Sequence, residues 1–533
     1  MKNKKLMIGS ILFMILFIGI TYYLFLPALN LSDPGFWAYL FVIIMVATFI
    51  RFINCIDLKT GRLKTNNITK LTKVVYLLIG IVFFGIIIVN VICSPLFNSS
   101  SYAKRITINE DGDFSTEVAE VDFNSIPLLD KASSTKLGDR VMGEMTDLVS
   151  QFYVSNLYTQ INYNNEVVRV TPLEYSGVIK YFTNRTEGVK GYIIVSSTTG
   201  ESKLVRLEKG MKYMPSALFN EDLSRKLRFS YPTEIFGEAS FELDNDGKPY
   251  WIVPTIKYTG VGLKQEINGI IMLDPITGES KKYKIDEIPS WVDHVYSASL
   301  ILEQVDDWGL YNNGFINSLF GQKGVVVSTD GYNYLTMNDD VYLYTGITSV
   351  ATDESNLGFI LCNMRTKETV YYQVPGAEEY SAMDSAKGQV QQMNYTSTFP
   401  LLINLEGRPT YLISLKDNAG LVKMYAFVDV QNYQRVVVTD ASKGINEAAR
   451  AYLSNNPIED NDNLITKEIT VSSITSSIIE GNTYYYIKDS EGNKYKVSIK
   501  VDEDYIPFIS IGDKITIGYN SLKEVTNIIK IVE

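Results

Sequence analysis

Two stretches of the sequence share one pattern: YSGVIKYFTNRTEGVKGYIIVSSTTGES (Tyr175 to Ser202) and YTGITSVATDESNLGFILCNMRTKET (Tyr344 to Thr369). Both begin with Tyr-x-Gly, continue with Gly-aromatic-Ile and end with Thr-x-Glu. Matched signals in the same order indicate a tandem duplication of one supersecondary unit.

The similarity continues beyond each stretch. A helix-like segment follows at 217–229 and at 378–393, and then DNDGKPYWIV (244–253) aligns with NLEGRPTYLI (404–413). GIIMLDPITGESKKYKI (269–285) aligns in turn with YAFVDVQNYQRVVV (425–438). Short runs of Val, Ile, Tyr and Thr between Gly, Asn and Asp predict antiparallel strands. We therefore expect an α+β fold with two related units, 173–290 and 342–440, each a helix on a sheet, that bury their open faces on each other.

The segment from Asp244 to Ile285, with DNDGKPYWIV, a spacer, Gly and then Asp-Pro-x-Thr-Gly-Glu, resembles the PepSY-like family. The resemblance implies a small exported or membrane-anchored module in which DPITGE turns the last hairpin. It also implies binding or inhibition of exported enzymes and other envelope proteins, without catalytic residues. The second copy departs from the pattern, because it keeps Asp429 but lacks Thr-Gly-Glu.

Residues 1–97 hold three apolar runs, Leu6 to Leu29, Phe36 to Ile53 and Val74 to Phe97. Each is close to the roughly 20 residues that cross a bilayer, so we expect three transmembrane helices. The first run follows a cationic start but is too long for a signal peptide and has no small-x-small cleavage site. Asp33 and Pro34 suit the cap and first turn of the second helix.

Cations set the expected orientation. Lysines precede the first helix, and the segment between the second and third helices is rich in Lys and Arg, whereas the loop 30–35 has none. The positive-inside rule therefore places the N-terminus in the cytoplasm and the region after Phe97 outside a multi-pass cell membrane. Of the three cysteines only Cys362 lies in that outer region, so no disulfide can form within it.

The charge is divided unequally along the chain. Residues 1–97 carry a net charge of +7 and the rest −18, which together give the −11 of the whole chain. An acidic exterior repels phosphate backbones and anionic headgroups, so nucleic acid and peripheral membrane binding are disfavoured. The chain is rich in Ile, Asn, Lys and Tyr, and its outer region has no disulfide. Both features resemble those of exported proteins of Gram-positive, low-GC bacteria.

Four further regions complete the expected organisation. Residues 98–172 read as a tether and a helical segment at 137–158, and residues 291–341 as a connector. Residues 441–463 read as a helix at 445–453 and an acidic linker at 457–463. The last region, 464–533, has five short strand-like runs, which predict a small OB- or SH3-like β-barrel.

Two residues are candidates for catalysis. His294, the single histidine, follows Asp293 and could act as a base, but no nucleophile lies near it in sequence. Cys362 lies inside an apolar strand, where cysteine packs as a small hydrophobic residue. Packing roles are favoured for both, and sites that need two histidines are excluded by composition.

Other polar clusters read as turns or surfaces. Glu242, Asp244 and Asp246 around Gly247, and Asp111 and Asp113 around Gly112, lack the full ligand series of a calcium loop. The glycines of GQKGVVVSTDG, Gly321, Gly324 and Gly331 with Lys323, lack Walker spacing. The tyrosines at 371–372 and 484–486 suit strands with one buried face more than ligand platforms.

The function expected from these features is a membrane-anchored, extracytoplasmic binding or scaffold protein. It would engage an envelope protein or wall component through sheet edges or the groove between the copies. We predict no catalytic, cofactor-binding or metal-binding residues. Two alternatives stay open: a sensor that signals through its helices, and a wall enzyme that uses Asp293 with Asp306 or Asp307 as acid and base.

Overall fold

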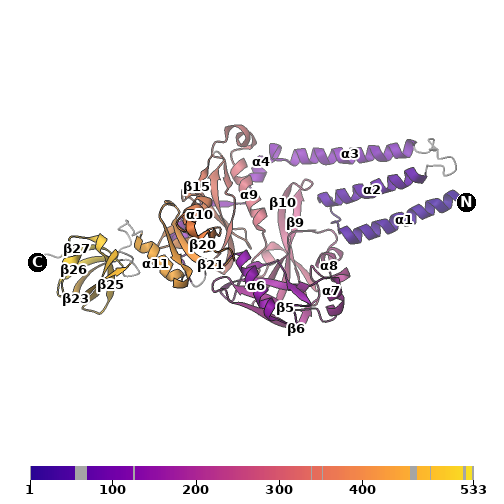
Figure 1. Cartoon of the computed structure of the whole chain (residues 1–533). Helices are drawn as coiled ribbons and strands as arrows, with labels where there is room; N and C mark the ends of the chain where they lie inside the picture. The colour runs from indigo at the N-terminus through magenta and orange to yellow at the C-terminus, as the bar shows by residue number, and fades with distance from the viewer. Residues whose placement is uncertain are drawn as a thin grey trace. The chain divides into compact units, whose positions relative to one another are not determined.

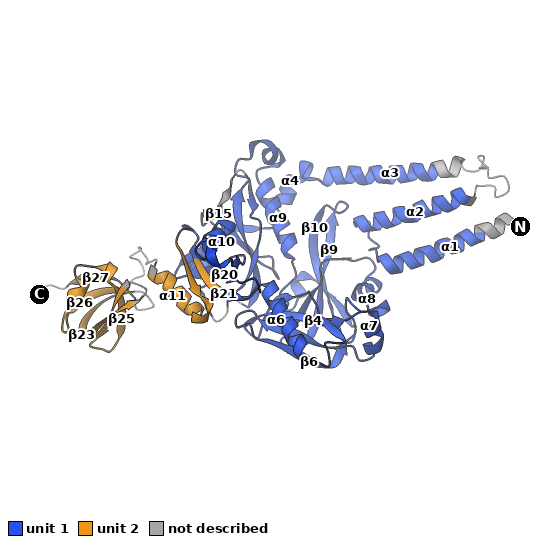
Figure 2. Cartoon of the chain, in the orientation of Figure 1, with its two compact units in different colours: residues 1–423, 428–434 blue, residues 424–427, 435–533 orange. Residues whose placement is uncertain are grey.

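The computed structural model describes residues 2–54, 69–123, 126–337, 339–350, 352–455, 465–479, 482–519 and 524–530. These form two compact units, shown in Figure 2. Unit 1 comprises residues 1–423 and 428–434, and unit 2 comprises 424–427 and 435–533. The expected acidic linker at 457–463 and most of the basic loop between the second and third helices lie outside the described residues.

Three helices near the N-terminus are long and apolar enough to cross a membrane, as predicted (Figure 1). They are α1 (Lys2–Phe25), α2 (Pro34–Asn54) and α3 (Thr69–Cys93). Their apolar windows have mean hydropathies of 2.2, 2.2 and 2.9. The third span is shorter than predicted, because Pro95 starts a new helix, α4 (Pro95–Ala103), after Ser94.

The folded part of unit 1 is attached to one end of these helices. The Leu29 N–H donates to Pro232 O (2.8 Å), and the Gly262 N–H donates to Ser32 O (3.1 Å). At the end of α3, the Asn90 side chain exchanges two hydrogen bonds with the backbone of Val261 (2.8 and 3.1 Å). The α1–α2 loop and the folded region are thus at the same end of the helices, as the predicted topology requires.

The first repeat of unit 1 runs from residue 131 to 283. Its elements are α6 (Lys131–Glu144), β2 (Phe152–Val154), β3 (Thr159–Tyr163), β4 (Glu166–Tyr175), α7 (Val178–Asn184), β5 (Val189–Ser196), β6 (Ser202–Met211), α8 (Leu223–Ser230), β7 (Ile235–Phe236), β8 (Ser240–Leu243), β9 (Pro249–Thr259), β10 (Lys264–Leu273) and β11 (Ser280–Tyr283). One sheet has the order β2-β4-β5-β6 with β3 also on β4, and the other has β11-β10-β9-β7 with β8 also on β9.

The second repeat has a similar order of elements along the chain, except that its described residues include no counterpart of α7 and contain the additional strand β17. They are α9 (Ala298–Tyr311), β12 (Val326–Ser328), β13 (Asn333–Met337), β14 (Asp340–Ser349), β15 (Thr352–Asn363), β16 (Thr369–Tyr372), β17 (Gly376–Ala377), α10 (Glu379–Gly388), β18 (Thr396–Ser397), β19 (Leu401–Leu405), β20 (Arg408–Lys416), β21 (Val422–Asp429) and β22 (Val436–Asp440). As β2, β3 and β5 pair with β4, so β12, β13 and β15 pair with β14. Two short elements precede the repeats: β1 (Ile108–Gly112), which pairs in parallel with β16, and α5 (Phe114–Glu117).

Each of the two similar series of elements is longer than the unit that the sequence indicated. Residues 98–172 and 291–341 are not merely a tether and a connector, because they contain α6 to β3 and α9 to β13, the first elements of each repeat. The helix expected at 137–158 starts at Lys131, where Asp130 caps it, and ends at Glu144. Residues 152–154 form β2, because this β-branched and aromatic run pairs with the end of β4.

The strand registers correct one part of the sequence alignment. In the first hairpin Tyr163 pairs with Glu166, and in the second Met337 pairs with Asp340, so Glu166 and Asp340 are equivalent. Counted along the strands from these two residues, the counterpart of Tyr344 is Val170 and not Tyr175. The Tyr-x-Gly match is thus a coincidence, and α7 is an insertion of the first repeat alone. The Gly-aromatic-Ile match is structural, since Gly191 and Gly358 take equivalent places on β5 and β15.

The two repeats share a hydrophobic core. Ile252 and Ile270 of the first repeat cluster with Leu300 and Val305 of α9 and with Ile360 of the second repeat. A separate core under the first repeat includes Trp251, whose Nε1–H donates to Tyr213 O (3.0 Å). The faces of the two copies are therefore buried against each other.

Unit 2 contains β22, α11 (Ile445–Asn455) and five strands at the positions predicted. The strands are β23 (Ile465–Ile479), β24 (Asn482–Asp489), β25 (Lys494–Ser498), β26 (Lys514–Tyr519) and β27 (Glu524–Lys530). Their pairings follow the order β23-β24-β25-β27-β26 and return from β26 to β23. The ring of pairs encloses a small core that includes Ile487, Val497 and Ile515.

Candidate functional site

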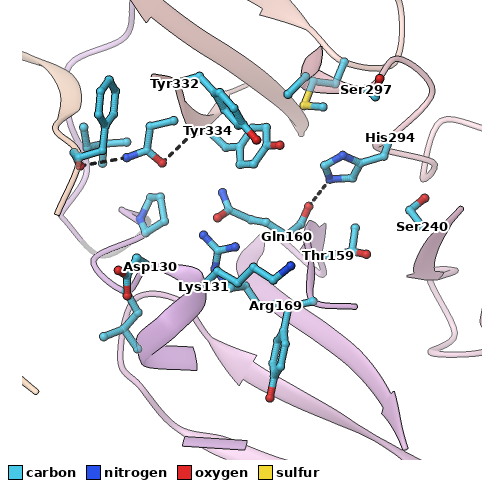
Figure 3. A pocket seen from close by; sticks show the side chains of 18 of the residues that line it. Asp130, Lys131, Thr159, Gln160, Arg169, Ser240, His294, Ser297, Tyr332 and Tyr334 are labelled. Atoms are coloured by element: carbon cyan, nitrogen blue, oxygen red, sulfur yellow. Dashed lines mark hydrogen bonds between the residues drawn. The ribbon is translucent and has the colours of Figure 1, made fainter. Parts of the chain in front are cut away.

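A cavity of about 550 Å³ lies in unit 1, where the two repeats meet. Its walls come from the starts of α6 and α9, from β3, β4 and residues 332–334, and from residues 238–240 and 398–414. This volume is within the range of small-ligand sites. Figure 3 shows the side chains of 18 of the residues that line it.

Arg169 is the principal charged group of the cavity. It lies in the middle of β4, its exposure is 7%, and its Nε has no hydrogen-bond partner. Burial lowers the pKa of its guanidinium, opposed by the nearby Tyr334 and Asp130. A guanidinium nevertheless stays charged at neutral pH. Among the described residues no carboxylate forms an ion pair with Arg169, so its buried positive charge is opposed only at longer range, by Asp130.

Gln160 stands directly opposite Arg169 in the β3–β4 pairing. Its side chain is 2% exposed, and both its Nε2 and its Oε1 lack partners. Buried polar atoms are nearly always hydrogen-bonded in folded proteins. Two adjacent side chains, Arg169 and Gln160, therefore have hydrogen-bonding atoms that no other group in the described part of the protein engages.

His294 lines the cavity beside Gln160. The backbone carbonyl of Gln160 accepts a hydrogen bond from its Nε2 (2.6 Å), which requires a proton on that nitrogen. Its ring meets the Tyr334 ring edge-on at 5.9 Å between centroids. Burial raises the pKa of Tyr334, so its hydroxyl is a neutral group of the cavity wall.

Helices α6 and α9 both begin at this cavity. Asp130 caps α6 by accepting from the Ser133 N–H (2.9 Å), and Ser297 caps α9 by accepting from the Leu300 N–H (3.3 Å). Helix N-termini carry partial positive charge and favour anions. The cavity therefore combines two positive helix ends with the Arg169 guanidinium.

Two carboxylates also border the cavity, but neither pairs with Arg169. Asp130 Oδ2 lies 2.5 Å from Lys416 Nζ. Burial acts to raise the pKa of Asp130, but hydrogen bonds from Lys416 and Ser133 outweigh it and lower the pKa. Glu238 is exposed. The exposed Lys131 adds a second cation at the start of α6.

The repeats contribute equivalent elements but different chemistry. Counted from the hairpin turns, Arg169 corresponds to Leu343 and Gln160 to Tyr334. Leu343 is part of the core, whereas Arg169 lines the cavity. The buried charge thus comes from the first repeat, and the equivalent position of the second repeat is apolar.

The acidic residues considered for catalysis lie in separate environments. Asp293 is buried, and Glu242 accepts hydrogen bonds from its backbone N–H (2.8 Å) and from that of His294 (3.3 Å). Burial and the Glu242 charge raise the pKa of Asp293 well above its usual range. Asp306 accepts from Ser328, and Asp307 pairs with Arg105. Burial raises the pKa of Asp307 to about 6, although Arg105 opposes it.

Cys362 is fully buried in the core shared by the repeats. It accepts a hydrogen bond from Thr369 Oγ1 (3.1 Å), and burial raises the pKa of its thiol to about 12. A thiol with that pKa stays protonated at neutral pH, so Cys362 is not an activated nucleophile.

The aspartate-rich segments form turns or caps. Asp244 accepts from the Lys248 N–H (2.8 Å) between β8 and β9, and Asp113 caps α5. Asp274 of DPITGE accepts from the Ile276 and Thr277 N–H groups and turns the β10–β11 hairpin, as expected. Glu242 points to Ser240 and Asp293, away from any calcium loop.

The remaining candidates form loops and packed strands. Lys323 lies in an exposed loop, where its N–H donates to Asn317 Oδ1 (3.3 Å). Tyr372 is buried and Tyr371 packs against Trp308, whereas Tyr486 is exposed. Within the described ranges, no three His, Cys, Asp or Glu side chains gather in a way that could hold a metal ion.

Sequence reasoning did not single out Arg169 or Gln160. The local signal is weak: one arginine inside the strand EVVRVTPLEY. An arginine in an otherwise apolar strand is unusual, because charged groups are almost never fully buried unless paired. Its importance emerges only in the structure, where residues of the second repeat such as Tyr334 cover the face of β4 on which Arg169 lies.

Comparisons with known proteins leave the chain without an assigned family. No protein-family model matches the sequence, and no curated protein matches it. Among solved structures, the chain is similar to an α-L-arabinofuranosidase from Lactobacillus brevis, at 8% identity over 70% of this chain and 95% of that one. The TM-score of 0.15 is too low for this likeness to support any statement about fold or activity.

Proposed function

We propose that this protein is a membrane-anchored, extracytoplasmic binding protein whose ligand presents an anionic group to Arg169. The observation that carries the proposal is a buried guanidinium without a counter-ion in a cavity of ligand size. An unpaired buried charge costs several kcal/mol. Bidentate pairing with a carboxylate or phosphate removes that cost.

The wider setting of this proposal is the outer face of a bacterial envelope. The positive-inside distribution of Lys and Arg supports an outer location for the folded region. The PepSY-like hairpin at Asp274 supports a role in binding envelope components rather than in catalysis. The cavity between the repeats is then the groove in which a wall component or the acidic side chain of an envelope protein is recognised.

The terminal ring of strands supports an accessory binding role. We infer an OB-like barrel, because its strand order is 1-2-3-5-4 and the third and fifth strands, β25 and β27, are parallel. OB folds bind extended ligands on the face of strands 2 and 3. The net charge of −18 of the region after residue 97 disfavours nucleic acid as that ligand.

A thermal-shift experiment on the full-length chain in nanodiscs tests the anion site. Inorganic phosphate, glycerol 3-phosphate and succinate are each titrated against the wild type and Arg169→Met. A ligand at 100 times its Kd stabilises the folded state by about 2.7 kcal/mol. We expect stabilisation of the wild type by at least one anion and none of Arg169→Met.

The matched control is Arg140→Met, which removes the same group from an exposed position on α6. This variant should respond to anions as the wild type does. Equal responses of all three proteins would contradict the proposed site.

A second function, signal relay to the membrane, is favoured by the course of α9. Its first turn lines the cavity, and its last turn packs Tyr311 against Tyr102 of α4, which follows α3 directly. Arg105, just after α4, pairs with Glu303 (2.7 Å) and with Asp307 on α9. Hydrogen exchange of α4 with and without the bound anion tests the relay: slowed exchange supports it, and unchanged exchange contradicts it.

A further inference from the structure

Two groups of apolar side chains project into solvent from unit 1. The first group, on α7 and around α8, contains Val178, Ile179, Phe182, Phe219 and Phe229, and the exposure of Ile179 reaches 75%. The second group, in the loop after α9, contains Ile316, Leu319 and Phe320, and the exposure of Phe320 is 81%. Contiguous exposed apolar groups of this kind mark interaction surfaces.

The first group is continuous with the outer end of α1. Phe229 packs against Tyr22 and Tyr23, with ring centroids 5.9 and 6.1 Å apart. Arg225 lies over the Tyr23 ring at 4.7 Å. Tyrosines at the end of a membrane helix occupy the lipid–water interface. Figure 1 shows α7 and α8 beside this end of α1.

The second group is connected to the end of α3 through α4. Phe315 stacks on Tyr311 at 6.3 Å, and Tyr311 packs edge-on against Tyr102 of α4 at 6.1 Å. Because α4 begins two residues after α3 ends, this loop also lies near the membrane surface. The two groups are therefore linked to different helices of the membrane region.

The charges on both groups suit a membrane surface. The α7 segment VIKYFTN carries Lys180 as its single charge, and residues 308–329 carry Lys323 as theirs. The carboxylates next to Phe219 are engaged, since Glu221 accepts from the Tyr181 hydroxyl (2.7 Å) and Asp222 caps α8. Apolar side chains with cations and without carboxylates are typical of interfacial membrane segments. The net acidity of the outer region is thus absent from these two places.

We propose that the two groups insert into the adjoining leaflet of the bilayer, one beside α1 and the other beside α3. The occupant of both surfaces is lipid. This contact holds the folded region close to the membrane and fixes its tilt, in addition to the three spans. It does not depend on the anion site.

Nitroxide labels at Ile179→Cys and Phe320→Cys test the proposal in the full-length chain, with Cys55 and Cys93 replaced by serine. Each nanodisc holds one protein in phosphatidylcholine and phosphatidylglycerol, so that a second copy cannot cover the labels. Lys203→Cys, on the exposed strand β6, is the aqueous control. Variants are used only if their thermal transitions match that of the parent.

We expect both labels to collide several-fold less often with a water-soluble nickel complex than the Lys203→Cys label, and more often with oxygen. Nickel accessibility equal to the control at either site would overturn the two-sided insertion.

Discussion

Replacement of Arg169 by methionine should stabilise the protein in the absence of multivalent anions. Methionine keeps the length and apolar stem of the side chain but removes a charge that is 7% exposed and has no ion-pair partner. The full penalty of a buried unpaired ion is several kcal/mol. Water in the cavity and the neighbouring Asp130 reduce it, so we expect a gain of about 1–3 kcal/mol in the free energy of unfolding.

The assay is thermal unfolding of the full-length chain in nanodiscs, in chloride buffer after exhaustive dialysis. One kcal/mol shifts the Tm of a domain of 150–250 residues by about 2–4 °C, and unit 1 is larger, so we expect a rise of roughly 2–6 °C. Arg140→Met, at a position with 78% side-chain exposure, should change the free energy by less than about 0.5 kcal/mol. Arg169→Lys keeps the charge and should give no gain.

Destabilisation by Arg169→Met would refute the reasoning. That result would mean that a counter-charge within the protein already compensates the guanidinium. The charge would then be a structural element and not a ligand-binding group.

Three further predictions concern other parts of unit 1. Asp293→Asn should stabilise the protein at neutral pH by about 1–3 kcal/mol. Burial and Glu242 raise the pKa of Asp293, so the stability of the wild type falls as the pH rises through that pKa. The advantage of the variant should vanish below about pH 3.9, the ordinary aspartate pKa. Asp130→Asn should raise anion affinity by roughly tenfold, or 1.4 kcal/mol. The reason is that asparagine still caps α6, while Lys416 loses its ion-pair partner and becomes a free cation. Calorimetric titration measures the change in affinity. Gly278→Ala should destabilise by about 1–3 kcal/mol in chemical unfolding, because φ is +75° and a Cβ would lie 2.3 Å from a tyrosine ring.

Each of these predictions has a control and a contrary result. Asp246→Asn, at an exposed turn, should leave the pH profile unchanged, and a flat wild-type profile would contradict the Asp293 argument. Unchanged or weaker affinity of Asp130→Asn would contradict a positive cavity. Gly143→Ala, where a Cβ meets nothing within 4 Å, should be neutral or stabilising, and a similar loss for Gly278 and Gly143 would contradict the steric argument.

Local features of the fold were predictable from the sequence. The three membrane helices follow from apolar runs of spanning length, and the five terminal strands follow from short β-branched and aromatic runs. The DPITGE turn was also recognisable, because Asp274 satisfies two N–H groups within its own loop. In each case neighbours in sequence determine the conformation.

Long-range features were not predictable in this way. The repeats begin at α6 and α9, where the two copies retain little similarity and the hairpin registers alone reveal the correspondence. The importance of Arg169 depends on covering elements more than 100 residues away, such as Tyr334. The strand pattern places Arg169 on one face of β4 but cannot show that the second repeat buries that face.

Isothermal titration of the full-length protein in nanodiscs, with the anion that gives the largest thermal shift, tests the central claim most directly. The account predicts one binding site per chain for the wild type and for Arg140→Met, and no measurable heat of binding for Arg169→Met. Binding of equal affinity and stoichiometry to Arg169→Met would contradict it.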